Sequence, residues 1–593
     1  MRLHHAPGIV ARAVAGRAAR LGTAAVALAA VAVVGLTGPA ASAAGAASAA
    51  LPAAGVAAAA PAASGDDWLH TSGNKIVDAA GKEVKLTGAN WFGFNAGERV
   101  FHGLWSGNMD KITRSMADRG INTVRVPISV ELLTEWKAGT YKPISVNTYA
   151  NPELEGKNSK QVFDQFLSLC EKYGLKVVLD VHSAAADNSG HIHPVWWNAS
   201  FTTEQFYQAW EWVATTYRNN DTIVGADIKN EPHGKADETP RAKWDGSTDA
   251  DNWKHVAETA AQRILAINPN LLIFVEGNET YPKDGVSWSS TDKTQYHNTW
   301  WGGNFRGARQ HPIDLGAQQD QLVYSPHDYG PLVFEQPWFK GEWSRATLER
   351  DVWDPNWLYL HKEGTSPLLI GEWGGFMDGG PNEKWMQAMA DLIVDRGLSH
   401  TFWCLNPNSG DTGGLLLNDW ASWDEEKYAL LKPTLWQSGG KFVSADHQVP
   451  LGGAGSTTGI SVTELNGGTV PSPSATPSSS PTPSVTPTAS PSVSPTGGTG
   501  ACTAAYRVVN SWSGGFQAEV TVTAAAARSG WTTTFTLPSG VTIGSLWNGT
   551  MSGTSPVTVK NLAWNGNIGP AASVTYGFQA SGSAPAALAV SCA

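Results

Sequence analysis

Eight short apolar segments between residues 66 and 450 alternate with amphipathic segments, and this alternation constrains the fold more than any other feature. The segments are rich in Val, Ile and Leu without strict alternation, as strands buried in a parallel sheet are. Helical periodicity separates most of them, over 160–173, 203–217, 253–268 and 383–396. The predicted strands are 85–89, 123–127, 176–181, 224–229, 271–276, 322–327, 367–372 and 401–405.

Eight consecutive strand-then-helix units predict an α/β fold of the (β/α)8, or TIM-barrel, type. The usual size of such a barrel, about 250 residues, leaves room here for long loops. A doubly wound open sheet is the alternative. No GxGxxG motif follows the first predicted strand, which disfavours the dinucleotide-binding form of that sheet.

The chain changes composition twice after this domain, which we place at 66–450. Residues 451–500 are first Gly-rich and then almost wholly Pro, Ser and Thr, a composition that predicts an extended linker. Residues 501–593 alternate short strands with turn residues and predict a small all-β sandwich. Cys502 and Cys592 lie near the two ends of this sandwich, so we expect a disulfide between them.

The N-terminal residues resemble a targeting segment rather than part of a fold. Residues 1–43 combine arginines, an apolar stretch from Leu21 to Leu36 and the small-residue site Ala41-Ser42-Ala43, which predicts a signal peptide. Residues 44–65 form an Ala-rich leader. We therefore expect a secreted, extracellular protein in an oxidising environment; an uncleaved membrane anchor is the alternative.

Charge and cysteine content limit the partners and cofactors. The net charge of −11 disfavours nucleic acid and anionic membranes, which both attract basic patches. No CxxC or Cys/His cluster occurs, so we expect no metal and no cofactor, and buried thiols at Cys170 and Cys404. We also expect a monomer. The 27 Trp residues indicate either a large aromatic core or stacking on sugar rings.

Polar residues gather where the predicted strands end, which is where a barrel of this type carries its functional groups. Two of these positions are Glu231 and Glu372. Glycoside hydrolysis needs such a pair, one carboxyl group to protonate the leaving oxygen and one carboxylate to attack the anomeric carbon. Groups on neighbouring strands can hold the two protonation states apart: Arg125, His182, Asn230, His327, Tyr329 and Trp403.

Four short motifs carry a resemblance to glycoside hydrolase family 5: TVRVP at 123–127, NEPH at 230–233, HDY at 327–329 and GEWG at 371–374. Longer strings such as GANWFGFNAGERVFHGLW are similar to the actinobacterial endo-β-1,4-glucanase branch of that family, over almost all of 68–435. The resemblance implies Glu231 as acid/base and Glu372 as nucleophile of a retaining enzyme. It also implies aromatic platforms in the cleft at Trp91, Trp105, Trp300 and Trp301.

The C-terminal segment holds four Trp residues, more than a sandwich of this size needs for packing. Trp531 lies in an apolar strand and is predicted to be the core residue. The other three stand beside turn residues, and with the two cysteines they resemble a family 2 carbohydrate-binding module. That resemblance implies binding to cellulose, with chitin as a minor ligand, through Trp512, Trp547 and Trp564.

Two other functions remain open on the sequence. Family 5 also contains mannanases and enzymes active on xylan or xyloglucan, and a cellulose-binding module suits those as well. A non-catalytic carbohydrate-binding protein is the more distant alternative, because it would be expected to lack one carboxylate or the residues around the pair.

Overall fold

The computed structural model describes residues 67–469, 502–512, 514–562, 565–570 and 572–593. The predicted signal peptide at 1–43, the predicted leader at 44–65 and the Pro/Ser/Thr part of the linker lie outside the described residues. None of the described helices is long and apolar enough to cross a membrane.

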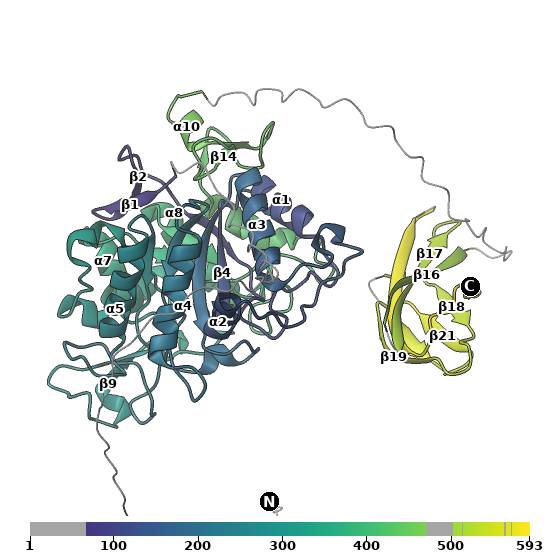
Figure 1. Ribbon diagram of the computed structural model, residues 1–593, viewed down its shortest axis with the longest axis horizontal. Coiled ribbons are helices and arrows are strands. Elements are labelled where there is room, and N and C mark those ends of the chain that lie inside the picture. The colour runs from purple at the N-terminus through teal and green to yellow at the C-terminus, as the bar shows by residue number, and fades with distance from the viewer. Residues whose placement is uncertain (1–66, 470–501, 513, 563–564, 571) are drawn as a thin grey trace, which may run out of the picture. The chain divides into compact units, whose positions relative to one another are not determined.

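Eight parallel strands form the central sheet of the larger part, in the order β10-β7-β6-β5-β4-β3-β12-β11 (Figure 1). Parallel bridges between Tyr324 and Leu368 and between His327 and Glu372 join the two outer strands. The sheet is therefore a closed barrel, and the predicted (β/α)8 fold is confirmed over the open sheet. Its strands are β3 (Thr87–Asn90), β4 (Thr123–Ser129), β5 (Lys176–Ser183), β6 (Ile223–Asp227), β7 (Leu272–Val275), β10 (Leu322–Tyr324), β11 (Leu369–Ile370) and β12 (Ser399–Phe402).

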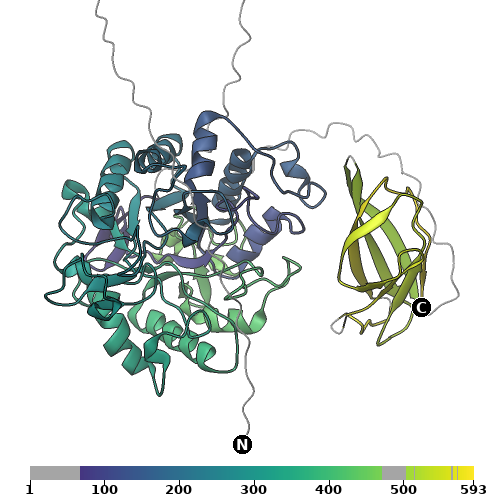
Figure 2. The same ribbon diagram turned by 90° about the horizontal axis from the view of Figure 1, so that it is seen from below.

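Helices lie outside the strands (Figure 2). Their starts follow from local chemistry: Asn158 and Thr202 form capping boxes with Gln161 and Gln205, and so begin the helices Ser159–Tyr173 and Thr203–Thr216, which precede and follow β5. A π-helical segment, Glu349–Leu358, surrounds Pro355. The helices are α1 (Met109–Asp118), α2 (Val130–Ala138), α3 (Ser159–Tyr173), α4 (Thr203–Thr216), α5 (Trp253–Ile267), α6 (Arg345–Leu348), α7 (Tyr359–Lys362), α8 (Pro381–Arg396), α9 (Glu425–Leu431) and α10 (Val462–Leu465).

Some short strands close the end of the barrel that lies opposite the cleft described below, and others lie in the loops of the barrel. A hairpin precedes the first barrel strand, and a second hairpin lies in the long loop after β7. In Figure 1, β2 and β9 lie at opposite ends of the barrel. These elements are β1 (Leu69–Ser72), β2 (Lys75–Asp78), β8 (Thr280–Pro282), β9 (Tyr296–Asn298), β13 (Gln437–Ser438), β14 (Lys441–Val443) and β15 (Gly459–Ile460).

Residues 451–469, predicted to begin the linker, instead fold against the barrel. β15 pairs with β14, and Val462 of α10 is buried in an apolar cluster with Leu69 and Val84. The predicted domain end at residue 450 is therefore wrong. Sequence patterns missed this extension because each of its elements has only two to four residues, too few to show a period.

The C-terminal part is a sandwich of two four-stranded antiparallel sheets, as predicted. Trp531 is buried in its core and stacks on Tyr576, with ring centroids 5.4 Å apart, which confirms it as the core residue. One sheet contains β16 (Cys502–Trp512), β17 (Gly515–Ala524), β22 (Ser573–Ser581) and β19 (Thr542–Trp547); the other contains β20 (Thr550–Ser552), β21 (Val557–Lys560), β18 (Thr532–Phe535) and β23 (Val590–Cys592).

Two of the three proposed binding tryptophans end strands of one sheet, Trp512 in β16 and Trp547 in β19. Their side chains, and the whole of Trp564, lie outside the described residues. Their role in binding stays a prediction.

The predicted disulfide joins Cys502 to Cys592 across 90 residues of sequence, and Cys170 and Cys404 are buried free thiols, as expected. Closing so long a loop restricts the unfolded chain, so replacing both disulfide cysteines by Ser should cost the module about 2–4 kcal/mol. Calorimetry of the full chain should show the module's transition at a lower temperature and the barrel's unchanged. Wild-type protein in reductant should match the variant; equal transitions in all three samples would contradict this expectation.

Candidate active site

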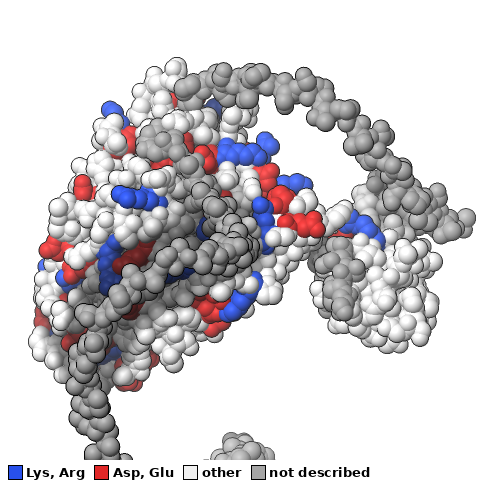
Figure 3. Space-filling view, viewed as in Figure 1, with Lys and Arg blue, Asp and Glu red and all other residues white. Residues whose placement is uncertain are grey.

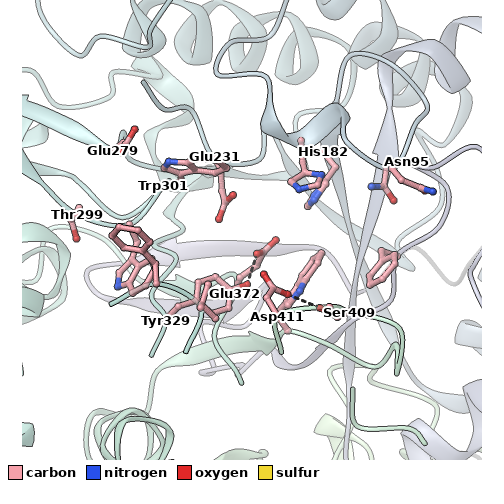
Figure 4. A pocket seen from close by; sticks show the side chains of 18 of the residues that line it. Asn95, His182, Glu231, Glu279, Thr299, Trp301, Tyr329, Glu372, Ser409 and Asp411 are labelled. Atoms are coloured by element: carbon pink, nitrogen blue, oxygen red, sulfur yellow. Dashed lines mark hydrogen bonds between the residues drawn. The ribbon is translucent and has the colours of Figure 1, made fainter. Parts of the chain in front are cut away.

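A cleft of about 980 Å³ lies over the C-terminal ends of the barrel strands, and Glu231 and Glu372 both line it (Figure 4). Glu231 comes four residues after the end of β6, and Glu372 two residues after β11. The bridge between His327 and Glu372 brings the ends of β10 and β11 side by side. Barrel closure, rather than nearness in sequence, therefore assembles the site.

The two carboxyl groups face each other at short range. An oxygen of Glu231, an oxygen of Glu372 and a ring nitrogen of His327 all lie within 4.8 Å of one another. Retaining glycosidases hold their carboxyl groups about 5–5.5 Å apart, and inverting ones about 6.5–9.5 Å apart to admit a water. This spacing fits direct attack by one carboxylate and a covalent intermediate.

Glu372 is bound in a way that favours its ionised form. Arg125 Nη1 donates to its Oε1 at 2.8 Å, and the Tyr329 hydroxyl donates to its Oε2 at 2.7 Å. Burial raises the pKa of Glu372 to about 8, and the charge of Arg125 and the hydrogen bond from Tyr329 offset part of that rise. Arg125 and Tyr329 are both among the strand-end residues that the sequence predicts to lie around the carboxyl pair.

Glu231 lacks such support and is therefore the better proton donor. Burial raises its pKa well above the usual value, and the neighbouring charge of Glu372 raises it further. Its Oε1 lies 3.0 Å from His327 Nδ1. Burial lowers the pKa of His327, which keeps the ring neutral. Of the two carboxyl groups, Glu372 thus loses its proton first.

Arg125 is fully buried at the centre of a charged network that lies beneath the cleft. Although burial opposes its charge, four carboxylates raise its pKa and keep it protonated. It also donates to the Asn230 side chain at 3.0 Å. The sequence pointed to Glu372 and Asn230 as members of this network. It missed the other three carboxylates, Asp180, Asp227 and Glu276, at 3.2, 2.8 and 3.1 Å.

Rings line the cleft on both sides of the carboxyl pair. Trp301 stacks on His233 at 3.7 Å, which fixes the indole as a platform. His182 stacks on Trp403 at 5.5 Å, and its Nδ1 contacts Asp180 Oδ2 at 2.6 Å. In Figure 4, Glu231 and Glu372 lie between Trp301 and His182. Trp300 also lines the cleft, edge-on to the ring of Tyr329.

The cleft does not include Trp91, and this prediction is wrong. Asn90, at the end of β3, points into the barrel and accepts from Arg125, so its neighbour Trp91 points outward, where it is fully buried against Phe101. Trp105 is only partly buried, but it packs edge-on against Trp420 and does not line the cleft. The cleft-lining ring is Phe92, which stacks on Trp403 at 5.5 Å.

Acidic and basic side chains are interspersed over the face of the barrel drawn in Figure 3, and the same face of the C-terminal part is almost uncharged. Only four residues from 501 to 593 carry a charge: Arg507, Glu519, Arg528 and Lys560. Such a surface suits a neutral polymer better than a polyanion.

Family models match both folded parts. Residues 77–409 match the model described as cellulase (glycosyl hydrolase family 5), and residues 502–593 match the model described as cellulose binding domain. Together these matches cover most of the described chain; of its folded barrel they leave out residues 67–76 and 410–469.

Curated proteins and solved structures agree with the models. Endoglucanase G of Acetivibrio thermocellus is 49% identical over 440 residues, covering 68% of this chain and 77% of that protein. An endoglucanase of Paenibacillus polymyxa is 38% identical over 62% of this chain and 87% of its own. The catalytic domain of the major endoglucanase from Xanthomonas campestris superposes with a TM-score of 0.55 at 32% identity, covering 62% of this chain and 99% of that one. The chain therefore belongs to glycosyl hydrolase family 5 and carries a C-terminal cellulose-binding domain.

Proposed function

We propose that this glycoside hydrolase is a retaining endo-β-1,4-glucanase with Glu372 as nucleophile and Glu231 as acid/base. The observation that carries the proposal is the carboxyl pair itself. Its oxygens approach within 4.8 Å, and only one member, Glu372, is bound by a cation and a phenol. One group is thereby suited to attack and the other to donate a proton.

The first step breaks the glycosidic bond. An oxygen of Glu372 attacks the anomeric carbon while the proton of Glu231 passes to the departing oxygen, which leaves a glycosyl ester on Glu372 and an ionised Glu231. In the second step Glu231 takes a proton from water, the water oxygen attacks the same carbon, and the ester breaks. Arg125 and Tyr329 then receive the restored charge on Glu372.

The remaining site residues bind the sugars. Trp301 and Trp300 are proposed to stack on rings on one side of the cleaved bond, and Trp403 with His182 on the other. Asn230, whose side-chain oxygen is held by Arg125, keeps its amide donors for a 2-hydroxyl. Because sugars fit on both sides of the pair, cleavage is expected within a chain.

Cellulose is the proposed polymer, and the extracellular space the proposed location. A cellulose-binding domain and relatives named endoglucanases support the polymer over mannan, xylan or xyloglucan. The Cys502–Cys592 disulfide and the composition of residues 1–43 support export. We propose that the enzyme acts there as a monomer, without nucleic acid or membrane as partner.

Proton NMR of cellopentaose hydrolysis tests the chemistry. The first product should be the β-anomer, because two displacements at one carbon retain its configuration. An initial α-anomer would rule out the proposed mechanism. A substrate panel tests the polymer: turnover should be highest on β-1,4-glucan, and clearly faster cleavage of mannan would reject that assignment.

A further inference from the structure

Glu276 is a fully buried carboxyl group that the mechanism above leaves without a role. It directly follows β7, and its side chain lies beneath the cleft rather than in its lining. Its Oε2 accepts the backbone N–H of Glu231 at 2.7 Å. Its Oε1 accepts from Arg125 Nη2 at 3.1 Å and lies 3.3 Å from His327 Nε2.

The backbone of Glu231 needs to be held in place. Its φ of 50° is left-handed, a conformation that non-glycine residues adopt only where surrounding structure enforces it. The hydrogen bond to Glu276 acts on the nitrogen of that same residue. It therefore fixes the direction in which the Glu231 side chain leaves the main chain.

The side chain of Glu231 is held through His327. One ring nitrogen, Nδ1, lies 3.0 Å from Glu231 Oε1, while Nε2 faces Glu276. Glu276 thus binds the backbone of Glu231 directly, and it lies beside the imidazole that contacts the Glu231 carboxyl group without a hydrogen bond to that ring.

The loop segment at Gly302 packs closely against the Glu276 side chain and restricts its movement. A Cβ added at Gly302 would lie 2.4 Å from Glu276 Oε2, well inside van der Waals contact. The loop that carries Trp300 and Trp301 therefore passes against this carboxylate with room only for glycine.

We propose that Glu276 is a positioning residue that sets the orientation of the acid/base Glu231 through its backbone N–H. This inference rests on the proposed function. Glu276 acts through Glu231 and need not touch the substrate, so its loss should affect proton donation and not nucleophilic attack.

Glu276→Gln in the full chain tests the proposal. Both oxygens of the Glu276 carboxylate accept hydrogen bonds, one from the Glu231 backbone N–H and one from Arg125. A glutamine side chain has only one accepting oxygen, so its NH2 group must face one of these two donors. We expect kcat/KM for cellopentaose, whose leaving group needs a proton, to fall about 10–100-fold, within the usual contribution of general acid catalysis. For 2,4-dinitrophenyl β-cellobioside, whose leaving group departs unprotonated, kcat/KM should fall less than about threefold.

Two further variants separate positioning from general damage. Gly302→Ala keeps every carboxyl group but displaces Glu276, so it should show the same dependence on the leaving group. Asp78→Asn removes a buried carboxylate of β2, which contacts His447 at the other end of the barrel; it should lower stability and leave the ratio of the two rates unchanged.

Equal losses on both substrates in Glu276→Gln and Gly302→Ala would overturn the proposal and leave Glu276 as a structural partner of Arg125. Unchanged rates on both substrates would overturn it as well. Wild-type protein that cleaves neither substrate would instead refute the proposed function, so the two failures are distinguishable.

Discussion

Glu372→Gln is expected to lose turnover of carboxymethyl cellulose while it still binds cellooligosaccharides. The amide has nearly the shape of the carboxylate but cannot attack the anomeric carbon, and losing a nucleophile costs on the order of 10⁴–10⁶ in kcat. Binding should persist because Trp301, Trp403 and the rest of the cleft are unchanged. Reducing-sugar release and calorimetric titration with cellotetraose measure the two quantities.

A matched control is Glu425→Gln, since the Glu425 side chain is exposed and pairs with Arg119 on the surface. It should retain wild-type turnover. Activity in Glu372→Gln equal to that of this control would show that Glu372 is not the nucleophile.

Glu231→Gln should give the second largest loss, and the loss should depend on the leaving group. General acid catalysis is worth about 10²–10⁴-fold, so cleavage of cellopentaose should fall by that factor. Formation of the glycosyl ester from 2,4-dinitrophenyl β-cellobioside should fall far less, because that leaving group needs no proton. Azide is an anionic nucleophile that needs no general base, so it can replace water in the second step, and added azide should yield a β-glycosyl azide.

The pH profile follows from the same pair. Burial and the charge of Glu372 raise the pKa of Glu231 well above its usual value, so wild-type kcat/KM should fall toward alkaline pH as this group loses its proton. At lower pH activity falls as Glu372 takes up a proton. Glu231→Gln should lose the alkaline limb and keep the acidic one. An alkaline limb unchanged in the variant would assign it to another group.

Much of this arrangement was predictable because it depends on local pattern. The eight strands are recognisable from their content of Val, Ile and Leu, and barrel geometry alone places Glu231 and Glu372 at the same end of the barrel. Their opposite roles needed the family resemblance. Order along the chain does not reveal that Arg125 and Tyr329 both reach Glu372.

The sequence did not reveal which individual side chains face the cleft or which charged side chains are buried. Trp91 and Phe92 are neighbours, and strand alternation sends the first into the helix layer and the second into the cleft. The predicted strand 271–276 ends on Glu276, yet strand-end charges are commonly solvated, so the burial of this carboxylate beside Arg125 had no distinct signal. Barrel closure is what buries them.

The most direct test of the central claim is covalent trapping with 2,4-dinitrophenyl 2-deoxy-2-fluoro-β-cellobioside, whose fluorine slows the second displacement. Mass spectrometry of the intact protein should show one fluorocellobiosyl group per chain, and peptide mapping should place it on Glu372. A label on Glu231, or rapid turnover of the wild-type enzyme on the non-fluorinated cellobioside without any label from the fluorinated one, would contradict the account.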